Sequence, residues 1–299
     1  MAQTIEQVVD MSLMYMYGLN THQDQETHIT VAINETDLTI SVDNASILSR
    51  GLIEVHDELM QSTSVDANAG TVTLAPYGRG YRGTVAKSAA IGARLVAAPL
   101  VPRFMMVSAL DEAVQGVWPD LYAEAETTIT TTGSANTYAL PAGAMNVIEV
   151  NYESRGSSKE WIPARRYRVD SDANTTAFPT GATISLYDGI STGTKVHVIY
   201  KKEPTSLGTD HTLGFAATTG LPESCIDVIR YGAAWRLGGM FDAPHLAGKS
   251  AEADFSSNVR PIGSGQSFGK YMYQLYMTRL AAESRKQKEE RTIRQHYTR

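Results

Sequence analysis

The sequence of 299 residues has a single cysteine, Cys225, which excludes a disulfide framework within the chain and a metal site of four thiolates. It also lacks any apolar run close to the roughly 20 residues that a transmembrane helix requires. The first residues have no basic region, and Glu6 and Asp10 lie where the apolar part of a secretory signal would be. We therefore predict a cytosolic origin and no membrane partner.

Motifs for cofactor and metal chemistry are missing as well. The sequence has no G-x-x-x-x-G-K-[ST] phosphate loop, and its seven histidines are scattered, with no H-E-x-x-H and no pair at i, i+4. A zinc site on a helix needs two ligands on one face, and this sequence does not supply them. We predict no catalytic residues, no metal and no cofactor, and therefore no enzyme.

One glycine-rich segment needs a closer test. Residues Gly78–Gly83 match the dinucleotide-binding pattern G-x-G-x-x-G in letters. In a dinucleotide site a helix begins at this turn, and an acidic residue follows about 20 positions later. The next acidic residue is Asp111, and Arg79, Tyr81 and Arg82 fill the turn with bulky side chains. We interpret the segment as a tight β-turn with functional or packing arginines.

The other reactive side chains have simple interpretations. Asp57–Glu58 and Asp111–Glu112 are adjacent carboxylates, and adjacent residues on a helix do not face each other. Because exposed acids are the norm, we predict a solvated surface for both pairs. Cys225 lies just inside a predicted helix N-terminus, a position that can lower the pKa of a thiol. Without an identifiable histidine partner, we interpret it as structural.

Charge is spread unevenly along the chain, whose formal net charge is −6. Residues 1–126 hold 6 basic and 16 acidic side chains, whereas residues 271–299 hold 7 basic and 3 acidic ones. An acidic N-terminal part is unsuited to nucleic-acid binding, since phosphate attraction supplies most non-specific affinity. The basic end could meet phosphate or an acidic protein surface.

Hydrophobic periodicity predicts the elements. Apolar residues at helical spacing predict helices over 4–19, 103–125 and 268–295, and another that begins at Pro222. Pro119 should kink or end the second of these helices after Trp118. Alternating apolar and polar residues predict short strands over 28–34, 37–42, 52–55, 59–64 and 71–75, followed by a second β-rich stretch over 127–203.

The order of these elements predicts an α+β fold rather than a doubly wound parallel sheet, because strands and helices do not alternate. We expect a discontinuous helical core domain with two inserted β-rich domains and a long C-terminal helix and tail. The helical core takes residues 1–24, 103–126 and 221–299. The β-rich inserts take 25–102 and 127–204, and a polar linker covers 205–220.

Tyrosine is abundant, at 15 residues against 6 phenylalanines, and it gathers on the two terminal helices. The residues are Tyr15, Tyr17, Tyr271, Tyr273 and Tyr276. An amphipathic aromatic surface on helices is typical of subunit interfaces. The alternative is that these rings pack the two terminal helices against each other within one subunit.

The C-terminal helix becomes strongly charged toward its end. Its basic residues include Arg279, Arg285, Lys286, Lys288, Arg291 and Arg294. Apolar residues thin out after Ala282, so we expect that this part does not bury a stripe against its own domain. It is then either a solvated helix end or a helix that docks on another molecule.

Several segments, in order, resemble a known family. Arg50–Val96 resembles a β module of tailed-phage neck and tail proteins, with Gly80, Gly83 and Thr84 at the matching positions of its turn and Arg82 in the same turn. The family usually has a histidine where this chain has Ser88 or Ala89. The further matches are Ala109–Tyr122, Glu126–Val150, Trp161–Asp170 and Thr219–Gly239 with the charged helix after it. Together they resemble the phage head-to-tail connector proteins, also called neck adaptors or tail-tubular, gatekeeper-type proteins.

This resemblance implies a structural virion protein at the head–tail junction, assembled in the host cytoplasm. Family members form a ring, usually of twelve copies, under the portal. The C-terminal helix and tail are expected to dock on the portal, and the β domains to face the next tail component, a nozzle or tail tube, or tail fibres. The genome leaves through the axial channel without specific binding.

Two other functions remain open at this point. A tail nozzle or fibre-attachment protein could carry similar β modules, but nozzles should be dominated by strands, and this chain begins and ends in helices. A virion enzyme acting on glycans or peptidoglycan would need paired carboxylates in a cleft.

Overall fold

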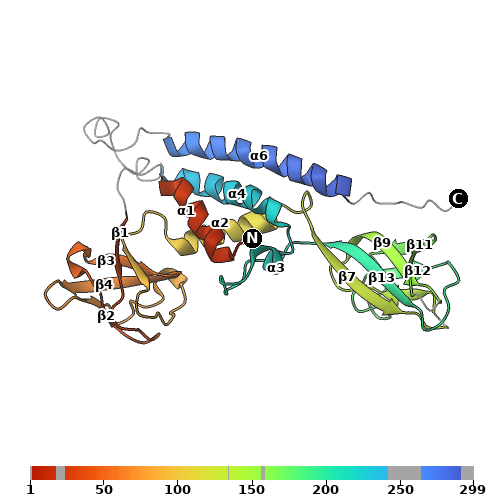
Figure 1. Cartoon of the computed structure of the whole chain (residues 1–299), viewed down its shortest axis with the longest axis horizontal. Coiled ribbons are helices and arrows are strands. Elements are labelled where there is room, and N and C mark those ends of the chain that lie inside the picture. Colours follow the sequence, from red (N-terminus) through yellow and green to blue (C-terminus); the bar gives the residue numbers. More distant parts are fainter. Residues whose placement is uncertain (1, 18–23, 134, 156–158, 242–263, 291–299) are drawn as a thin grey trace. The chain divides into compact units, whose positions relative to one another are not determined.

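The computed structural model describes residues 2–17, 24–133, 135–155, 159–241 and 264–290. In these residues the chain is α+β, with five α-helices and thirteen strands in three sheets (Figure 1). The chain divides into two compact units. The barrel unit comprises residues 4–113 and 229–276, and the sandwich unit comprises residues 1–3, 114–228 and 277–299.

Six antiparallel strands of the barrel unit form one sheet in the order β1-β6-β3-β4-β5-β2. Their bounds are β1 Gln25–His28, β2 Thr39–Ser41, β3 Gly51–Val55, β4 Glu58–Asp66, β5 Thr71–Leu74 and β6 Arg94–Ala97. The first and last strands meet just beyond their ends, where Ile29 bridges Val42 and Thr30 N donates to Ser41 O at 2.9 Å. This contact links the two end strands of the sheet, which is thereby curled into a barrel.

The barrel encloses an apolar core whose members all lie between residues 29 and 97. Ile40, Ile53, Met60, Val72 and Leu95 are fully buried in it. In β5 the buried Val72 and Leu74 alternate with exposed Thr73, whereas β3, β4 and β6 bury consecutive residues.

The strand predicted over 28–34 is wrong in part. Strand β1 ends at His28, and beyond it only Ile29 and Ile33 form isolated bridges. Val31, which the alternation placed on the same buried face, is 57% exposed. The chain bends at Thr30–Val31, so the alternation does not continue in space.

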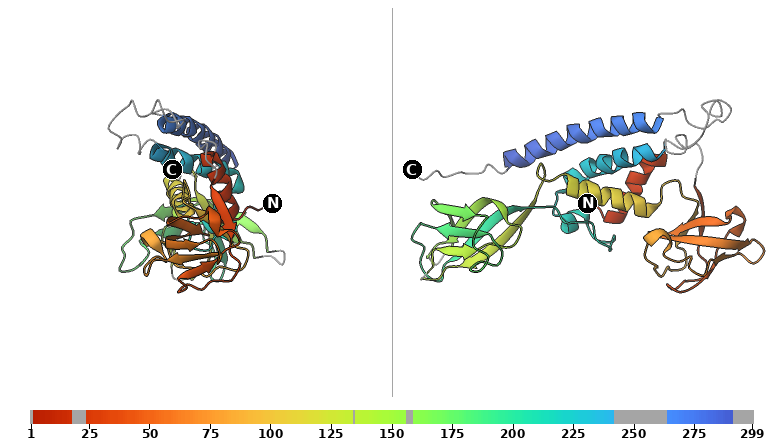
Figure 2. Two further views of the ribbon diagram at one scale, coloured as in Figure 1. Left: turned by 90° about the vertical axis from the view of Figure 1, so that its left-hand side faces the viewer. Right: turned by 180° about the vertical axis from the view of Figure 1, so that it is seen from behind.

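Parts of four helices complete the barrel unit, and they lie side by side (Figures 1 and 2). The helices are α1 Ile5–Tyr17, α2 Arg103–Gly116, α4 Ile226–Gly238 and α6 Ser264–Glu290. Helix α1 begins with a capping box, because Gln7 N donates to Thr4 Oγ1 at 3.3 Å and Thr4 N donates to Gln7 Oε1 at 3.1 Å. Its buried residues recur at helical spacing, so one face of α1 is apolar.

Close packing of these helices depends on a glycine. A Cβ at Gly232 of α4 would lie 3.0 Å from the Cβ of Ala113 in α2 and 3.3 Å from the ring of Tyr276 in α6. A larger side chain at this position would push the helices apart.

The strands of the sandwich unit form two sheets, with the orders β10-β9-β13-β7 and β11-β12-β8. Their bounds are β7 Ala123–Thr130, β8 Thr137–Ala139, β9 Met145–Glu153, β10 Trp161–Pro163, β11 Tyr167–Asp170, β12 Thr183–Leu186 and β13 Lys195–Lys202. An apolar core with Leu140, Val150, Ile184, Val196 and Val198 fills the space between them. The two layers are seen in the green and yellow strands of Figure 2.

Three predicted segments differ from the observed ones. The segment 205–220, predicted as a linker, contains the short helix α3 Phe215–Thr219. The helix predicted over 103–125, with a kink or end after Trp118, ends at Gly116, and β7 already begins at Ala123. The helix predicted over 268–295 begins earlier, at Ser264, and residues 291–295 lie outside the described part of the chain.

Candidate interaction surfaces

The glycine-rich turn of the barrel unit contains the short 3-10 helix η2 Tyr81–Gly83. Gly80 precedes it with φ +57°, and a Cβ there would lie 2.7 Å from the carbonyl oxygen of Thr84. The Thr84 hydroxyl accepts a hydrogen bond from Leu59 N at 3.1 Å and so ties the turn to β4. Arg82 is exposed in the left-handed region, and Gly83 has φ +85°. Irregular chain leads from the turn to β6, so there is no helix N-terminus to receive a pyrophosphate.

Arg79, the first arginine of this turn, is buried. Its guanidinium donates to both oxygens of Glu58, at 2.8 and 3.0 Å, and to the carbonyl oxygens of Asp37 and Lys87. Glu58 also accepts hydrogen bonds from the backbone N–H groups of Gly80 and Lys87, both at 2.9 Å. The pair therefore joins the β1–β2 connection and the β5–β6 connection to the start of β4.

The prediction of a solvated Glu58 is wrong, because the residue is fully buried. Sequence reasoning singled out Arg79 as bulky in the turn, but it gave no partner for it. The only signal in the sequence was an arginine between the two glycines Gly78 and Gly80 of a tight turn.

A second buried carboxylate joins the barrel to helix α2. Glu54 on β3 accepts hydrogen bonds from the backbone N–H of Arg103, at 2.9 and 3.1 Å, and thereby caps the start of α2. Burial raises the pKa of Glu54 to about 8. The Arg103 side chain makes ion pairs with Asp10 of α1 and with Asp57. This cluster holds α1, α2 and the β3–β4 hairpin together within the barrel unit.

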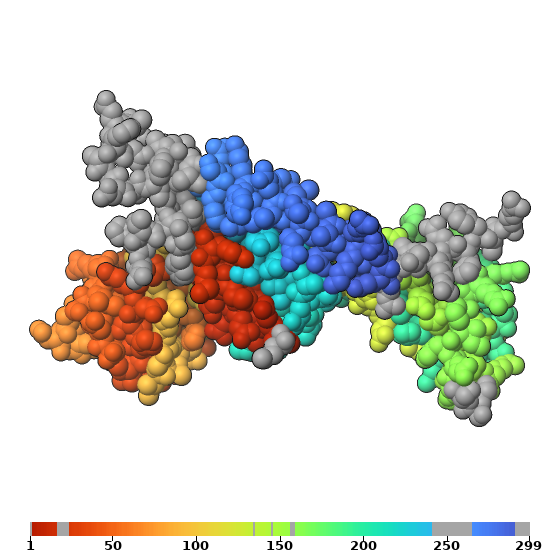
Figure 3. Space-filling model, turned by 45° about the horizontal axis from the view of Figure 1, so that its top comes forward, coloured from red at the N-terminus to blue at the C-terminus, as the bar shows by residue number. Residues whose placement is uncertain are grey.

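The tyrosines of the terminal helices meet helix α4. Tyr15 of α1 lies 5.7 Å from the ring of Tyr231, and Tyr273 of α6 lies 5.4 Å from the ring of Trp235. Tyr276 is buried against Gly232, whereas Tyr271 is 56% exposed and Tyr273 is 45% exposed. The Tyr17 side chain lies outside the described part of the structure. Figure 3 looks onto an uncovered side of α6, drawn in blue.

The predicted docking residues of the C-terminal helix have different surroundings. Arg279 pairs with Asp227 at 3.1 Å, Arg285 with Glu289 at 2.8 Å, and Lys286 lies 3.9 Å from Glu283. Lys288 is exposed and forms no ion pair with the described residues. Arg291 and Arg294 lie outside the described part of the chain.

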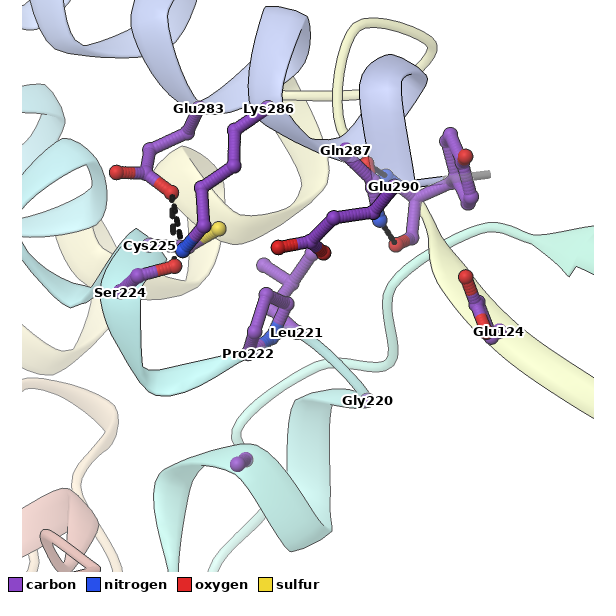
Figure 4. Close-up of a pocket in the computed structure, with 12 residues that line it drawn as sticks. Glu124, Gly220, Leu221, Pro222, Ser224, Cys225, Glu283, Lys286, Gln287 and Glu290 are labelled. Atoms are coloured by element: carbon purple, nitrogen blue, oxygen red, sulfur yellow. Dashed lines mark hydrogen bonds and ion pairs between the residues drawn. The ribbon is translucent and has the colours of Figure 1, made fainter. Parts of the chain in front are cut away.

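A pocket of about 400 Å³ lies in the sandwich unit beside the second half of α6 (Figure 4). Its floor is formed by Gly220–Pro222 and by the 3-10 helix η3 Glu223–Cys225, and the side chains of Glu283 and Gln287 project into it from α6. Ser224 Oγ donates to Glu283 at 2.7 Å. Gln287 donates to the carbonyl oxygen of Tyr122 at 2.7 Å and accepts from its N–H at 3.3 Å.

These contacts correct the expectation that the helix beyond Ala282 is either solvated or docked on another molecule. Helix α6 continues to pack against its own chain beyond Ala282, although its apolar residues are exhausted there. It does so through polar side chains, since Ser284 is buried and Gln287 is half-buried. An apolar stripe is therefore not the only way in which this helix is held.

Cys225 lies in the wall of this pocket as a buried free thiol. Burial and the neighbouring carboxylate of Glu283 raise its pKa to about 12. The thiol is therefore protonated at neutral pH, which agrees with a structural role.

No group of histidine, cysteine or acidic residues in the described ranges is arranged to hold a metal ion. Within those ranges, no helix is both long enough and apolar enough to cross a membrane.

The comparison with protein families decides the identity of the chain. The family model of the SU10 adaptor protein matches residues 86–287, about two thirds of the sequence. The chain belongs to the SU10 adaptor protein family. The match includes α2, the whole sandwich, α4 and most of α6. No curated protein matches the chain.

Membership confirms the resemblance to phage head-to-tail connector proteins. This SU10-type adaptor is a structural protein of a phage virion, where it associates with other virion components. We therefore interpret the pocket and the side-chain clusters described above as features of a protein that assembles with other virion components.

Proposed function

We propose that this adaptor forms a ring that joins the portal at the capsid vertex to the tail, and that the ring surrounds the channel through which the genome leaves. Family membership over residues 86–287 is the observation that carries the proposal. By the family resemblance the ring has twelve copies, and its further partners are a nozzle or tail tube and tail fibres. DNA passes through it without specific binding, and no enzymatic step is involved.

The C-terminal half of α6 supports portal docking. Lys288 is exposed. Burial, and after it the charge of Lys288, lowers the pKa of Lys201, which lies over the ring of Tyr122 at 4.1 Å. The charges of these two lysines repel each other at this end of the helix. An acidic groove on a partner would relieve the repulsion, and we assign the docking role to Arg279, Arg285, Lys286, Lys288, Arg291 and Arg294.

We also propose that the two β-rich parts, 25–102 and 127–204, are inserts in a helical core of 1–24, 103–126 and 221–299, connected by 205–220. The separate apolar cores of the barrel and the sandwich support this division, since each lies within one insert. Self-contained cores allow such parts to act as interaction modules.

The exposed aromatic residues of α6 support a role in subunit contact. Tyr271 and Tyr273 are about half exposed, and aromatic side chains are enriched at protein interfaces. We assign Tyr15, Tyr17, Tyr271, Tyr273 and Tyr276 to a surface of which part packs on α4 and part meets the next copy. The turn with Gly80, Arg82, Gly83 and Thr84 shapes the end of the barrel.

The test is the mass of the adaptor measured by light scattering, alone and with purified portal ring. We expect a monomer of 32.5 kDa that becomes a stoichiometric ring on the portal. Reversal of Arg285, Lys288, Arg291 and Arg294 to glutamate should weaken portal binding and remove most of its salt dependence. A control with the same charge change reverses exposed Arg50, Arg82, Lys195 and Lys270.

Unchanged portal binding of the first variant would reject the docking role of the helix. A wild-type protein that ignores the portal and binds tail tips or cell-wall material would reject the adaptor ring in favour of a distal tail component.

A further inference from the structure

The sandwich has two different sides. Strands β7 and β8 are joined by residues 131–136, and β10 and β11 are joined by residues 164–166. These four strands are the edge strands of the two sheets. One sheet has β7 and β10 at its edges, and the other has β8 and β11. The short connections keep each pair on one side, so one side of the sandwich presents β7 and β8 and the opposite side presents β10 and β11.

The β7 side is an open sheet edge. Strand β7 has eight residues, Ala123–Thr130, and among the described strands it pairs only with β13. It contains no proline and no lysine, which are the usual protection of an edge against pairing with another chain. Its exposed residues include two carboxylates, Glu124 and Glu126, and Glu126 lies 3.0 Å from His197 on the open face of the sheet.

The β10–β11 side is basic and partly apolar. Arg165, Arg166 and Arg168 are exposed, and their guanidinium groups make no ion pair or hydrogen bond with any residue that the structure describes. In β10, Trp161 is 48% exposed and Ile162 is 38% exposed, and the Trp161 ring lies 5.4 Å from the ring of His197. Exposed tryptophan and arginine are both enriched at protein interfaces.

We propose that the β10–β11 side of one copy binds the β7 edge of the next copy, and that this contact closes the adaptor ring. The inference rests on the ring proposed above. The arginines of one copy would meet Glu124 and Glu126 of its neighbour, and the open backbone groups of β7 would gain hydrogen-bond partners. Because the two surfaces differ and lie on opposite sides of the sandwich, the contact is heterologous, and on the portal template we expect repeated contacts of this kind to close into a ring and not an open filament.

Charge reversal tests the contact with portal ring as the template. The variant Arg166→Glu/Arg168→Glu places like charges at every junction, and so does Glu124→Lys/Glu126→Lys. Each variant should raise the protein concentration required for ring formation at least tenfold. The four changes together restore opposite charges at every junction and should restore the ring. The control Arg50→Glu/Arg82→Glu has the same net charge as the first variant and should form rings like the wild type.

Cross-linking tests the geometry without any change of charge on the acidic side. Cys225 is the only native cysteine and is buried, so cross-links are expected to form only between the introduced thiols. Thr128→Cys/Arg168→Cys should give a ladder of linked copies after oxidation on the portal. A mixture of the two single variants should stop at linked pairs, and Thr128→Cys alone should stay unlinked.

The outcomes separate this inference from the proposed function. If the wild type forms rings and both reversal variants do so equally well, the sandwich contact is wrong and the ring stands. If the wild type forms no ring on the portal, the proposed function itself fails. Loss of duplex DNA retention by Arg166→Glu/Arg168→Glu, with rings intact, would assign the arginines to DNA and overturn the contact.

Discussion

Arg79 and Glu58 form a two-point ion pair inside the barrel unit, with Nε–Oε1 at 2.8 Å and Nη2–Oε2 at 3.0 Å. Their side chains are 8% and 1% exposed. Because backbone N–H and C=O groups of the β1–β2 and β5–β6 connections complete the pair, each charge has partners within the protein. The loops at this end of the barrel are therefore fixed before any partner binds.

Removal of one partner should destabilise the barrel strongly. Arg79→Met leaves the Glu58 carboxylate buried without its cation, which costs about 3–5 kcal/mol for buried pairs. The free energy of unfolding, measured in urea by circular dichroism, should fall by that amount. Arg82→Met in the same turn is the control, since Arg82 is exposed, and it should change the value by about 0.5 kcal/mol or less. Equal losses in both variants would contradict the role of Arg79.

Two glycines of the turn give a matched pair. Both Gly80 and Gly83 have positive φ, where any other residue costs about 1–2 kcal/mol. A Cβ at Gly80 would also lie 2.7 Å from the carbonyl oxygen of Thr84, whereas a Cβ at Gly83 meets open space. Gly80→Ala should therefore lower the thermal midpoint clearly more than Gly83→Ala. The reverse order would show that the turn rearranges to admit a side chain at Gly80.

The buried carboxyl of Glu54 predicts a dependence of stability on pH. Its folded pKa is about 8, above the ordinary value of 4.5, so the folded state holds the proton more tightly than the unfolded state. The contribution is complete below pH about 4.5 and is lost as the pH rises toward about 8. Glu54→Gln should make the thermal midpoint less dependent on pH over this interval. Glu26→Gln, at an exposed residue, should leave the pH dependence unchanged. A profile unchanged by Glu54→Gln would exclude this group as its cause.

The amide of Gln287 should hold the second half of α6. Gln287→Ala removes two hydrogen bonds to the backbone of Tyr122, each worth about 1 kcal/mol. Amide hydrogen exchange in residues 280–290 should become faster by about tenfold or more, while the barrel strands stay protected. Lys288→Ala, one residue away and exposed, should leave this exchange unchanged. Faster exchange in both variants would instead indicate a general effect on the helix.

Cys225 should be unreactive in the folded protein. Its pKa of about 12 and its burial keep it a protonated, covered thiol at neutral pH. A disulfide reagent should label it only when urea unfolds the sandwich unit, and the labelling curve should follow the unfolding curve. Rapid labelling in buffer would show that the pocket beside α6 opens.

Local patterns in the sequence determined the helices well. Thr4 and the apolar spacing after it predicted a helix over 4–19, and the structure confirms α1 at Ile5–Tyr17. The strands predicted at 52–55 and 71–75 are found as β3 and β5 within a residue of each end. These elements are set by a period of 3.6 or 2 residues and by capping groups only three positions away, which a single sequence displays.

Tertiary structure alone decided the rest. Glu58 was predicted as solvated, because its partners Arg79 and Lys87 lie 21 and 29 residues further along the chain and no local pattern connects them. Closure of the barrel between Ile29 and Val42, and the hold of Gln287 on Tyr122 across 165 residues, are likewise contacts between distant segments. Buried polar groups must find partners wherever the fold brings them, so their roles are set by the folded chain and not by neighbours in sequence.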